Sequence, residues 1–175
     1  MEFSIREINR WDPGDDVDTI AALAREIWTE HYVPITGQAQ VDYMLQSFQS
    51  APVITADLTE RGHRYWLAEA AGVPIAYCAG VAEAEQLFLS KIYIHRSHRG
   101  LGLSRQFLGL LSQWCREAGL SRIELKVNKQ NHSTIAAYKK LGFSTVRAAE
   151  FDIGNGFIQD DYIMALPIEL IEAHG

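Results

Sequence analysis

The sequence has few cysteines, no excess of positive charge and no long apolar run. Cys78 and Cys115 are its two cysteines and lack a CxxC spacing, so we expect small core residues in a reducing compartment. Sixteen Lys and Arg against 22 Asp and Glu give a net charge of −6, which argues against broad nucleic-acid binding and a polybasic membrane surface. The longest weakly polar stretch, residues 70–82, has 13 residues, whereas a membrane-spanning helix needs about 20.

Several functional motifs are also missing. Met1 and Glu2 begin no basic segment followed by an apolar one, so we expect no signal peptide and a cytoplasmic protein. The six histidines show no metal-ligand pairing on a helix, which predicts that there is no metal site. The GxxxxGK[ST] pattern of phosphate-binding loops is absent, which argues against an NTPase.

The length and the order of apolar patterns predict one α+β domain over residues 1–175. A domain has roughly 150 residues, and 47% hydrophobic residues are typical of a globular chain. Strand-like segments and helical spacings mix along the chain, without repeats or linkers. Residues 31–37, with Pro34 and Gly37, are expected to form a loop. Strands are predicted over residues 3–8, 65–69, 75–81, 87–94 and 123–127 and on both sides of Gly154-Asn155-Gly156, and helices over residues 20–28, 40–48, 107–118 and 133–141.

A glycine-rich turn lies between the predicted strand at residues 92–94 and the following helix. Its sequence is Arg99-Gly100-Leu101-Gly102-Leu103-Ser104, and small residues at such a turn let main-chain amides approach a ligand closely. The eleven residues from His95 to Arg105 contain three arginines, two histidines and no acid, which suits a phosphorylated ligand. A dinucleotide-binding GxGxxG motif is incomplete, because Arg105 occupies its third glycine position. The turn alone is equally compatible with a helix start that has a solvated basic rim.

These residues resemble the (Q/R)-x-x-G-x-(G/A) signature of the GNAT N-acetyltransferase family, with Ser104 in place of the final glycine or alanine. A second block, residues 128–143, resembles the family pattern N-x-x-A-x-x-x-Y-x-x-x-G-F. The element order is similar over nearly the whole chain. Within the family, residues 91–94, 127–129 and 151–162 are similar to a bacterial spermidine/spermine N-acetyltransferase subgroup.

The resemblance implies a single GNAT-like domain, with a mixed, mostly antiparallel sheet of about seven strands and about four helices. It also implies acetyl-CoA as cosubstrate, with main-chain amides of the glycine-rich turn around the pyrophosphate and the strand edge at residues 92–94 along the pantetheine. Asn131 would bond the cofactor arm, and Tyr138 would be the catalytic acid that protonates the departing thiolate. The predicted cofactor-binding residues are Ile92, Tyr93, Ile94, Arg99, Gly100, Leu101, Gly102, Leu103, Ser104, Arg105, Asn131 and Tyr138.

The function that the resemblance implies is direct acetyl transfer to a primary amine, with a small polyamine such as spermidine or spermine favoured. An amine with a pKa of about 10.4 is mostly charged, and neutralising it at pH 7 costs about 4.6 kcal/mol, so a base, a water chain or a desolvating pocket must supply the free lone pair. Many relatives carry a carboxylate just ahead of the strand, where this chain has Ser90 and Lys91. Candidates for the base are His31, Glu85, Asp161 and Tyr162.

The acceptor site is less defined than the cofactor site. His31, Tyr32 and Asp161 are the predicted substrate-binding residues. Four acids between residues 150 and 161, without Lys or Arg, are either a solvated hairpin or a rim that attracts polycations. Strand alternation allows at most one of Asp160 and Asp161 to face the cleft. A protein N-terminal or lysine acetyltransferase and a non-catalytic acyl-CoA-binding regulatory module remain as alternatives, and a homodimer is compatible with each.

Overall fold

The structure is a computed structural model, which describes residues 2–172. Within these residues seven strands form one sheet in the order β1-β2-β3-β4-β5-β7-β6. β4 and β5 pair in parallel, whereas the β1–β2, β2–β3, β5–β7 and β6–β7 pairs are antiparallel. The predicted α+β fold with a mixed, mostly antiparallel sheet is therefore confirmed. The strands are β1 (Ser4–Glu7), β2 (Arg64–Ala70), β3 (Val73–Ala82), β4 (Gln86–Ile94), β5 (Arg122–Asn128), β6 (Ser144–Gly154) and β7 (Phe157–Pro167).

Six α-helices occur in the described residues, two more than the sequence predicts. Helix α3 was not expected: it has Pro52 in its first turn, which suits a helix start, and buries Ile54 and Leu58 at i, i+4 spacing. The short α6 was not expected either. The helices are α1 (Asp16–Thr36), α2 (Gln38–Phe48), α3 (Ala51–Thr59), α4 (Leu103–Ala118), α5 (His132–Leu141) and α6 (Ile168–Glu172), and a 3-10 turn, η1, covers Arg96–His98.

The predicted loop at residues 31–37 is wrong, because α1 continues through Pro34 to Thr36. A proline cannot donate a main-chain hydrogen bond to the preceding turn, but its fixed φ is compatible with a helix. The turn is held on both sides of the proline. Tyr32 stacks on Trp28 with ring centroids 4.2 Å apart, and the Gly37 amide donates to the Val33 carbonyl at 2.9 Å. Local packing therefore outweighs the single lost bond.

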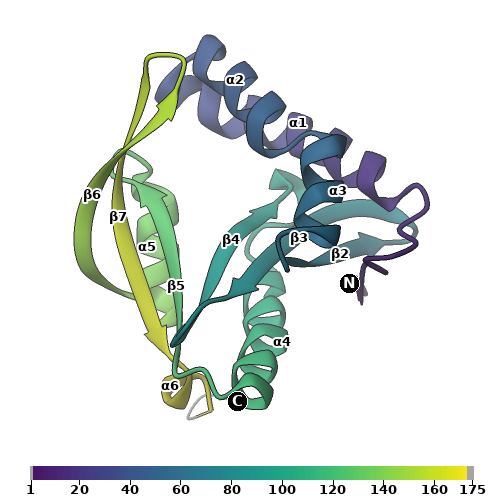
Figure 1. Ribbon diagram of the computed structural model, residues 1–175, viewed down its shortest axis with the longest axis vertical. Coiled ribbons are helices and arrows are strands. Elements are labelled where there is room, and N and C mark those ends of the chain that lie inside the picture. Colours follow the sequence, from purple (N-terminus) through teal and green to yellow (C-terminus); the bar gives the residue numbers. More distant parts are fainter. Residues whose placement is uncertain (1, 173–175) are drawn as a thin grey trace. The chain divides into compact units, whose positions relative to one another are not determined.

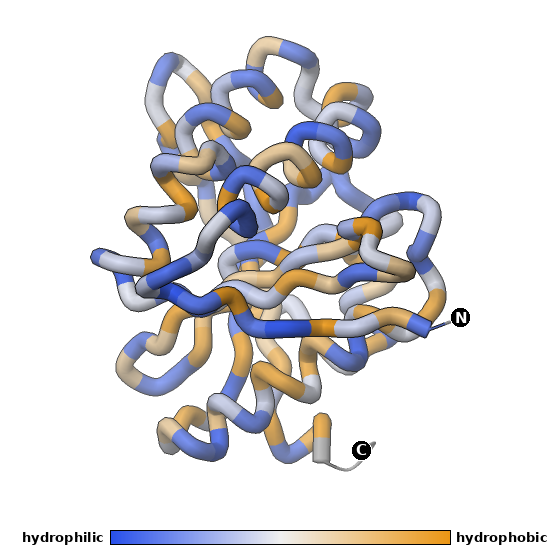
Figure 2. Tube along the Cα trace, turned by 90° about the vertical axis from the view of Figure 1, so that its right-hand side faces the viewer, coloured by the Kyte–Doolittle hydropathy of each residue, from blue (hydrophilic) through white to orange (hydrophobic). Residues whose placement is uncertain are grey.

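The described chain divides into two compact units. The first unit, residues 2–81 and 91–104, contains β1–β3, the end of β4 and helices α1–α3. Its core is made of apolar side chains from both helices and strands, including Ile20, Ile54, Leu58, Leu67 and Tyr77. Figure 2 shows hydrophilic and hydrophobic residues alternating along the helices, as expected for helices with one apolar face.

The second unit, residues 82–90 and 105–172, contains the start of β4, the strands β5–β7 and helices α5 and α6 with most of α4. β6 and β7 form a long hairpin beside β5 (Figure 1). The core of this unit includes Leu87, Phe107, Leu111, Ile123 and Met164. That residues 1–175 act as one domain stays a prediction.

Between residues 2 and 172, no helix combines the length with the apolar character that crossing a bilayer requires.

Candidate active site

The glycine-rich turn lies in the first unit and joins β4, through η1, to the start of α4. Gly100 and Gly102 have φ values of +79° and +88°, which is the left-handed region that favours glycine. No heavy atom lies within 4 Å of a Cβ built at either position, so the space beside the main chain is open. Helix α4 begins directly afterwards at Leu103, whose side chain is buried. The turn thus presents exposed backbone directly ahead of a helix start, an arrangement that suits an anion.

The basic residues around this turn are partly neutralised, a feature that the local sequence does not reveal. Arg99 Nη2 lies 3.0 Å from Glu30 Oε2, and Arg99 Nε donates to the Ile94 carbonyl at 3.0 Å. His95 Nε2 lies 2.8 Å from Glu26 Oε1, one turn earlier on α1. The hydrogen bond from Arg99 lowers the pKa of Glu30. The segment itself contains no acid, but α1 brings two carboxylates beside it, and one of them holds the Arg99 guanidinium in place.

An aromatic cluster surrounds the predicted pantetheine strand. The Tyr93 ring lies 5.4 Å from Trp28, 5.4 Å from Tyr77 and 6.3 Å from Tyr32, between ring centroids. His31 packs edge-on against Tyr32 at 4.8 Å. The structure therefore brings together Tyr93 of the predicted cofactor strand and both predicted acceptor residues of α1.

Lys91 is a buried residue that bonds to neighbouring elements. It occupies the position at which the family resemblance predicts a carboxylate. Its side chain is buried, with 6% of the residue exposed, and Nζ donates to the Phe48 carbonyl at 2.5 Å and to the Tyr65 hydroxyl at 2.6 Å. Burial lowers the pKa of Lys91 to about 8, although the carboxylate of Asp57 acts in the opposite direction. Neither Asp57 nor this role of Lys91 was predicted, because a single Lys in an apolar strand gives no sequence signal for burial.

The second unit carries the predicted catalytic acid. Tyr138 lies on α5, is half-buried, and packs against Phe143 with ring centroids 5.6 Å apart. The helix ends at Gly142, whose left-handed φ of +107° lets the Phe143 amide donate to the Tyr138 carbonyl at 3.0 Å. Asn131 is buried at the N-cap position of the same helix. Main-chain hydrogen bonds therefore hold the C-terminal end of the helix that carries Tyr138.

Asp160 and Asp161 have opposite environments on β7. Asp160 is exposed and pairs with Lys129, Oδ1 to Nζ, at 2.7 Å. Asp161 is only 4% exposed, and its Oδ1 has no hydrogen-bond partner among the described residues. Burial raises the pKa of Asp161 to about 6; Lys126 and Lys129 oppose this shift, and Asp160 adds to it. The alternation expected from the pleat is present, with Asp161 as the inward residue.

Two further candidates for the base, Glu85 and Tyr162, have environments unlike that of Asp161. The side chain of Glu85 is 78% exposed and lies 3.8 Å from Arg122, between Oε2 and Nη1. Tyr162 is half-buried, with Lys129 Nζ 5.5 Å from its ring centroid.

The parallel β4–β5 ladder is short. It joins Gln86–Phe88 to Arg122–Glu124 and ends there, although β5 continues to Asn128. On its other side β5 stays paired with β7 as far as Asn128 and Asp161. Within the second unit, one edge of β5 near its end therefore has no strand partner, and such an edge can bind an extended ligand.

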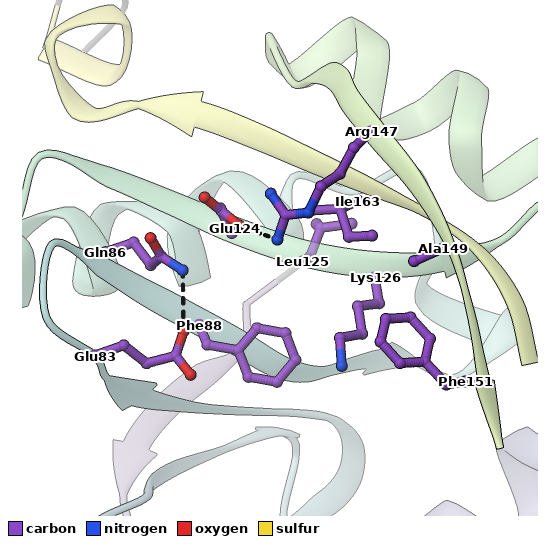
Figure 3. A pocket seen from close by; sticks show the side chains of 10 residues that line it. All are labelled: Glu83, Gln86, Phe88, Glu124, Leu125, Lys126, Arg147, Ala149, Phe151 and Ile163. Atoms are coloured by element: carbon purple, nitrogen blue, oxygen red, sulfur yellow. Dashed lines mark hydrogen bonds and ion pairs between the residues drawn. The ribbon is translucent and has the colours of Figure 1, made fainter. Parts of the chain in front are cut away.

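A pocket of about 300 Å³ opens on the same unit, over β4, β5, β6 and β7 (Figure 3). Lys126 lies in it between two aromatic rings, with Nζ 3.9 Å from the centroid of Phe151 and 5.3 Å from that of Phe88. Glu124 is buried beside it and pairs with Arg122 at 2.8 Å and with Arg147 at 3.6 Å. This pocket is not predictable from local sequence patterns, because its residues come from four separate segments.

Comparisons with known proteins agree with this architecture. Residues 20–143 match the model of the acetyltransferase (GNAT) family. YobR of Bacillus subtilis, an uncharacterized N-acetyltransferase, is 34% identical over 65 residues, which are 37% of this chain and 26% of YobR. The chain covers 26% to 57% of the length of five curated relatives.

Two solved structures are similar over most of the chain. The PaiA N-acetyltransferase from Thermoplasma acidophilum, in complex with coenzyme A, has a TM-score of 0.78 at 19% identity, over 95% of this chain and 99% of that one. The ribosomal-protein-S18-alanine N-acetyltransferase of Escherichia coli has a TM-score of 0.68 at 18% identity, over 95% and 94%. At these identities the similarity shows a shared fold.

Proposed function

Because the chain belongs to the acetyltransferase (GNAT) family, we propose that it is an enzyme that transfers the acetyl group of acetyl-CoA directly to a primary amine. The observation that carries this proposal is the exposed turn at Gly100 and Gly102, which places left-handed glycines directly ahead of the start of α4. The match to the family model includes this turn and Tyr138. The coenzyme A complex of the PaiA enzyme supports the choice of cosubstrate.

Each segment of the proposed cosubstrate site is assigned a role in binding acetyl-CoA or in the transfer. The main-chain amides from Gly100 to Arg105 bind the pyrophosphate, and the open space beside both glycines accommodates it. The edge of β4 at residues 92–94 binds the pantetheine, and Asn131 bonds to the cofactor arm. Tyr138 donates its hydroxyl proton to the thiolate as the C–S bond breaks. Neither cysteine is the nucleophile, since Cys78 and Cys115 are both buried and burial raises the pKa of each thiol.

The acceptor that we propose is a small polyamine. A net charge of −6 and the acids of the β6–β7 hairpin favour a cation over an anionic acceptor. Asp161 and the aromatic side chains around His31 and Tyr32 are proposed to contact it. The alternative acceptor is a protein N-terminus or lysine, which the similarity to the ribosomal-protein-S18-alanine enzyme supports.

The test is the release of coenzyme A thiol from acetyl-CoA in the presence of spermidine, spermine, a monoamine, an N-terminal peptide and a lysine peptide. Preference for the polyamines, with a KM that rises as salt screens the acidic hairpin, is the expected result. Preference for a peptide supports the alternative acceptor. Binding of acetyl-CoA without thiol release for any amine overturns the enzymatic proposal and favours a regulatory acyl-CoA-binding module.

A further inference from the structure

The proposed reaction needs a group that removes a proton from the acceptor. An ammonium ion has no lone pair with which to attack a thioester, so its proton must pass to a base. The residue directly ahead of the pantetheine strand is Lys91, which is buried and already bonded to Phe48 and Tyr65. It carries no carboxylate, so the base has to come from another element.

Asp161 has a feature that a purely structural carboxyl group does not need. Its Oδ1 is buried and has no donor among the described residues. Buried acceptors in folded proteins almost always have a hydrogen-bond partner, so an unpaired one marks a place for a donor from outside the chain. An ammonium or amine N–H is such a donor.

The position of Asp161 suits this role. It pairs with Asn128 at the end of β5, where the β4 side of β5 has no strand partner in the second unit. Asn128 is followed closely by Asn131 and by α5, which carries the proposed acid Tyr138. Asp161 therefore lies on β7 beside the end of β5, and from that end the chain continues into α5.

The strand register places Asp161 beside the pocket of Figure 3. Asp161 is directly opposite Ala149, and Ile163 lies two residues further along the same face; both of these residues line the pocket. Lys126, opposite Ile163, contributes a positive charge on this face. The charged groups that act on Asp161 within its unit are Lys126, Lys129 and Asp160. An acceptor group bound beside Ala149, at the margin of this pocket, would lie next to Asp161.

We propose that Asp161 is the general base of the acetyl transfer, an inference that rests on the function proposed above. The carboxylate takes one proton from the ammonium group, and the freed nitrogen lone pair attacks the thioester carbonyl carbon. The C–S bond then breaks, Tyr138 gives its proton to the sulfur, and the second nitrogen proton returns to Tyr138. One proton leaves with the products, as the overall reaction of an ammonium ion with acetyl-CoA requires.

The titration of Asp161 fits this chemistry. A pKa of about 6 keeps the carboxyl group ionised at pH 7 to 8, yet makes it a stronger base than an ordinary aspartate.

The experiment compares Asp161→Asn with Asp160→Asn, which changes the neighbouring, exposed carboxylate. Both variants are assayed with spermidine over a range of pH, and with ethylamine and trifluoroethylamine, which are similar in size but differ in basicity. Acetyl-CoA binding and thermal unfolding are measured for each variant. For Asp161→Asn we expect kcat to fall by about 10²-fold or more at pH 7, with unchanged acetyl-CoA affinity. The loss should shrink as the pH approaches the pKa of the amine, and should nearly vanish for trifluoroethylamine, which is already neutral.

The outcomes separate the two proposals. An equal loss for both amines and at every pH shows a structural role and overturns the assignment of the base, as does wild-type activity of Asp161→Asn. If Asp161→Asn does not fold, Asp161→Glu and the pH dependence of wild-type kcat test the inference instead. For the wild type, kcat at saturating amine should fall below about pH 6, and a kcat that does not change with pH overturns the inference. A wild-type protein that acetylates no amine contradicts the proposed function itself.

Discussion

Lys91 and Asp57 form a buried ion pair, with Nζ 3.3 Å from Oδ2 and side-chain exposures of 7% and 8%. Tyr65 donates its hydroxyl proton to the same oxygen at 2.5 Å, and Arg61 Nε lies 2.8 Å from the other oxygen. Through Lys91 the pair also reaches the Phe48 carbonyl at the end of α2. One network therefore ties β4 to α2, α3 and β2.

Removing either partner should destabilise the protein, but to different degrees. Asp57→Asn leaves the buried Lys91 without a carboxylate, and breaking a buried pair in this way costs about 3–5 kcal/mol. Lys91→Met leaves an Asp57 that Tyr65 and Arg61 still hold, so the expected loss is smaller, about 1–3 kcal/mol. Urea unfolding of both variants measures the difference.

The exposed Arg6–Asp16 pair provides the control. Arg6 Nη1 lies 2.7 Å from Asp16 Oδ2 near the surface, so Asp16→Asn should cost about 1 kcal/mol or less. If Asp57→Asn costs no more than Asp16→Asn, the buried network does not hold the strand.

The buried Lys91–Asp57 pair also predicts a pH dependence of stability. The pKa of Lys91 is about 8 in the folded protein, below the ordinary 10.5, because burial disfavours the ammonium form. Between these values the unfolded chain binds more protons, so this group's contribution to the free energy of unfolding rises with pH. Wild-type stability minus that of Lys91→Met should therefore increase from pH 8 to about 10. A difference that stays constant or falls contradicts the lowered pKa.

The sequence predicts the parts of this protein that rest on local patterns. Strand alternation, the helix stop at Gly142 and the turn at Gly100 and Gly102 each depend on neighbouring residues, and the structure has them. Long-range pairings have no such local signal. The approach of Glu26 and Glu30 to the basic turn depends on how α1 packs. The pocket around Lys126 depends on the pairing of four strands.

The error at residues 31–37 has a related cause. Pro34 favours a break when it is considered alone, but stacking of Tyr32 on Trp28 stabilises the last turns of α1. The assignment of His31 and Tyr32 to the acceptor site stays a prediction, and so does the role of each cofactor-binding residue.

Gly102→Glu should abolish measurable acetyl-CoA binding. The new side chain would occupy the open space beside the turn and bring a negative charge to the proposed pyrophosphate site. The left-handed φ of +88° adds strain of about 1–2 kcal/mol. Gly72→Glu is the matched control, since Gly72 also has a positive φ of +77° and open space but lies in the β2–β3 turn. Calorimetric titration should detect wild-type affinity in the control alone; equal affinity in both variants removes this turn from the cosubstrate site.

Tyr138→Phe should lower kcat by about 10²-fold while leaving the affinity for acetyl-CoA close to that of the wild type. The phenyl ring keeps the packing against Phe143, whose centroid lies 5.6 Å away, and the helix end at Gly142 is untouched, so only the hydroxyl group is lost. Without its proton the sulfur must leave as a thiolate, which slows the breakdown of the tetrahedral intermediate. Single-turnover rates, together with calorimetric affinity, separate this effect from weaker binding, and Tyr43→Phe on α2 controls for the loss of a tyrosine hydroxyl elsewhere. An unchanged kcat in Tyr138→Phe would assign the protonation of the thiolate to solvent or to another group.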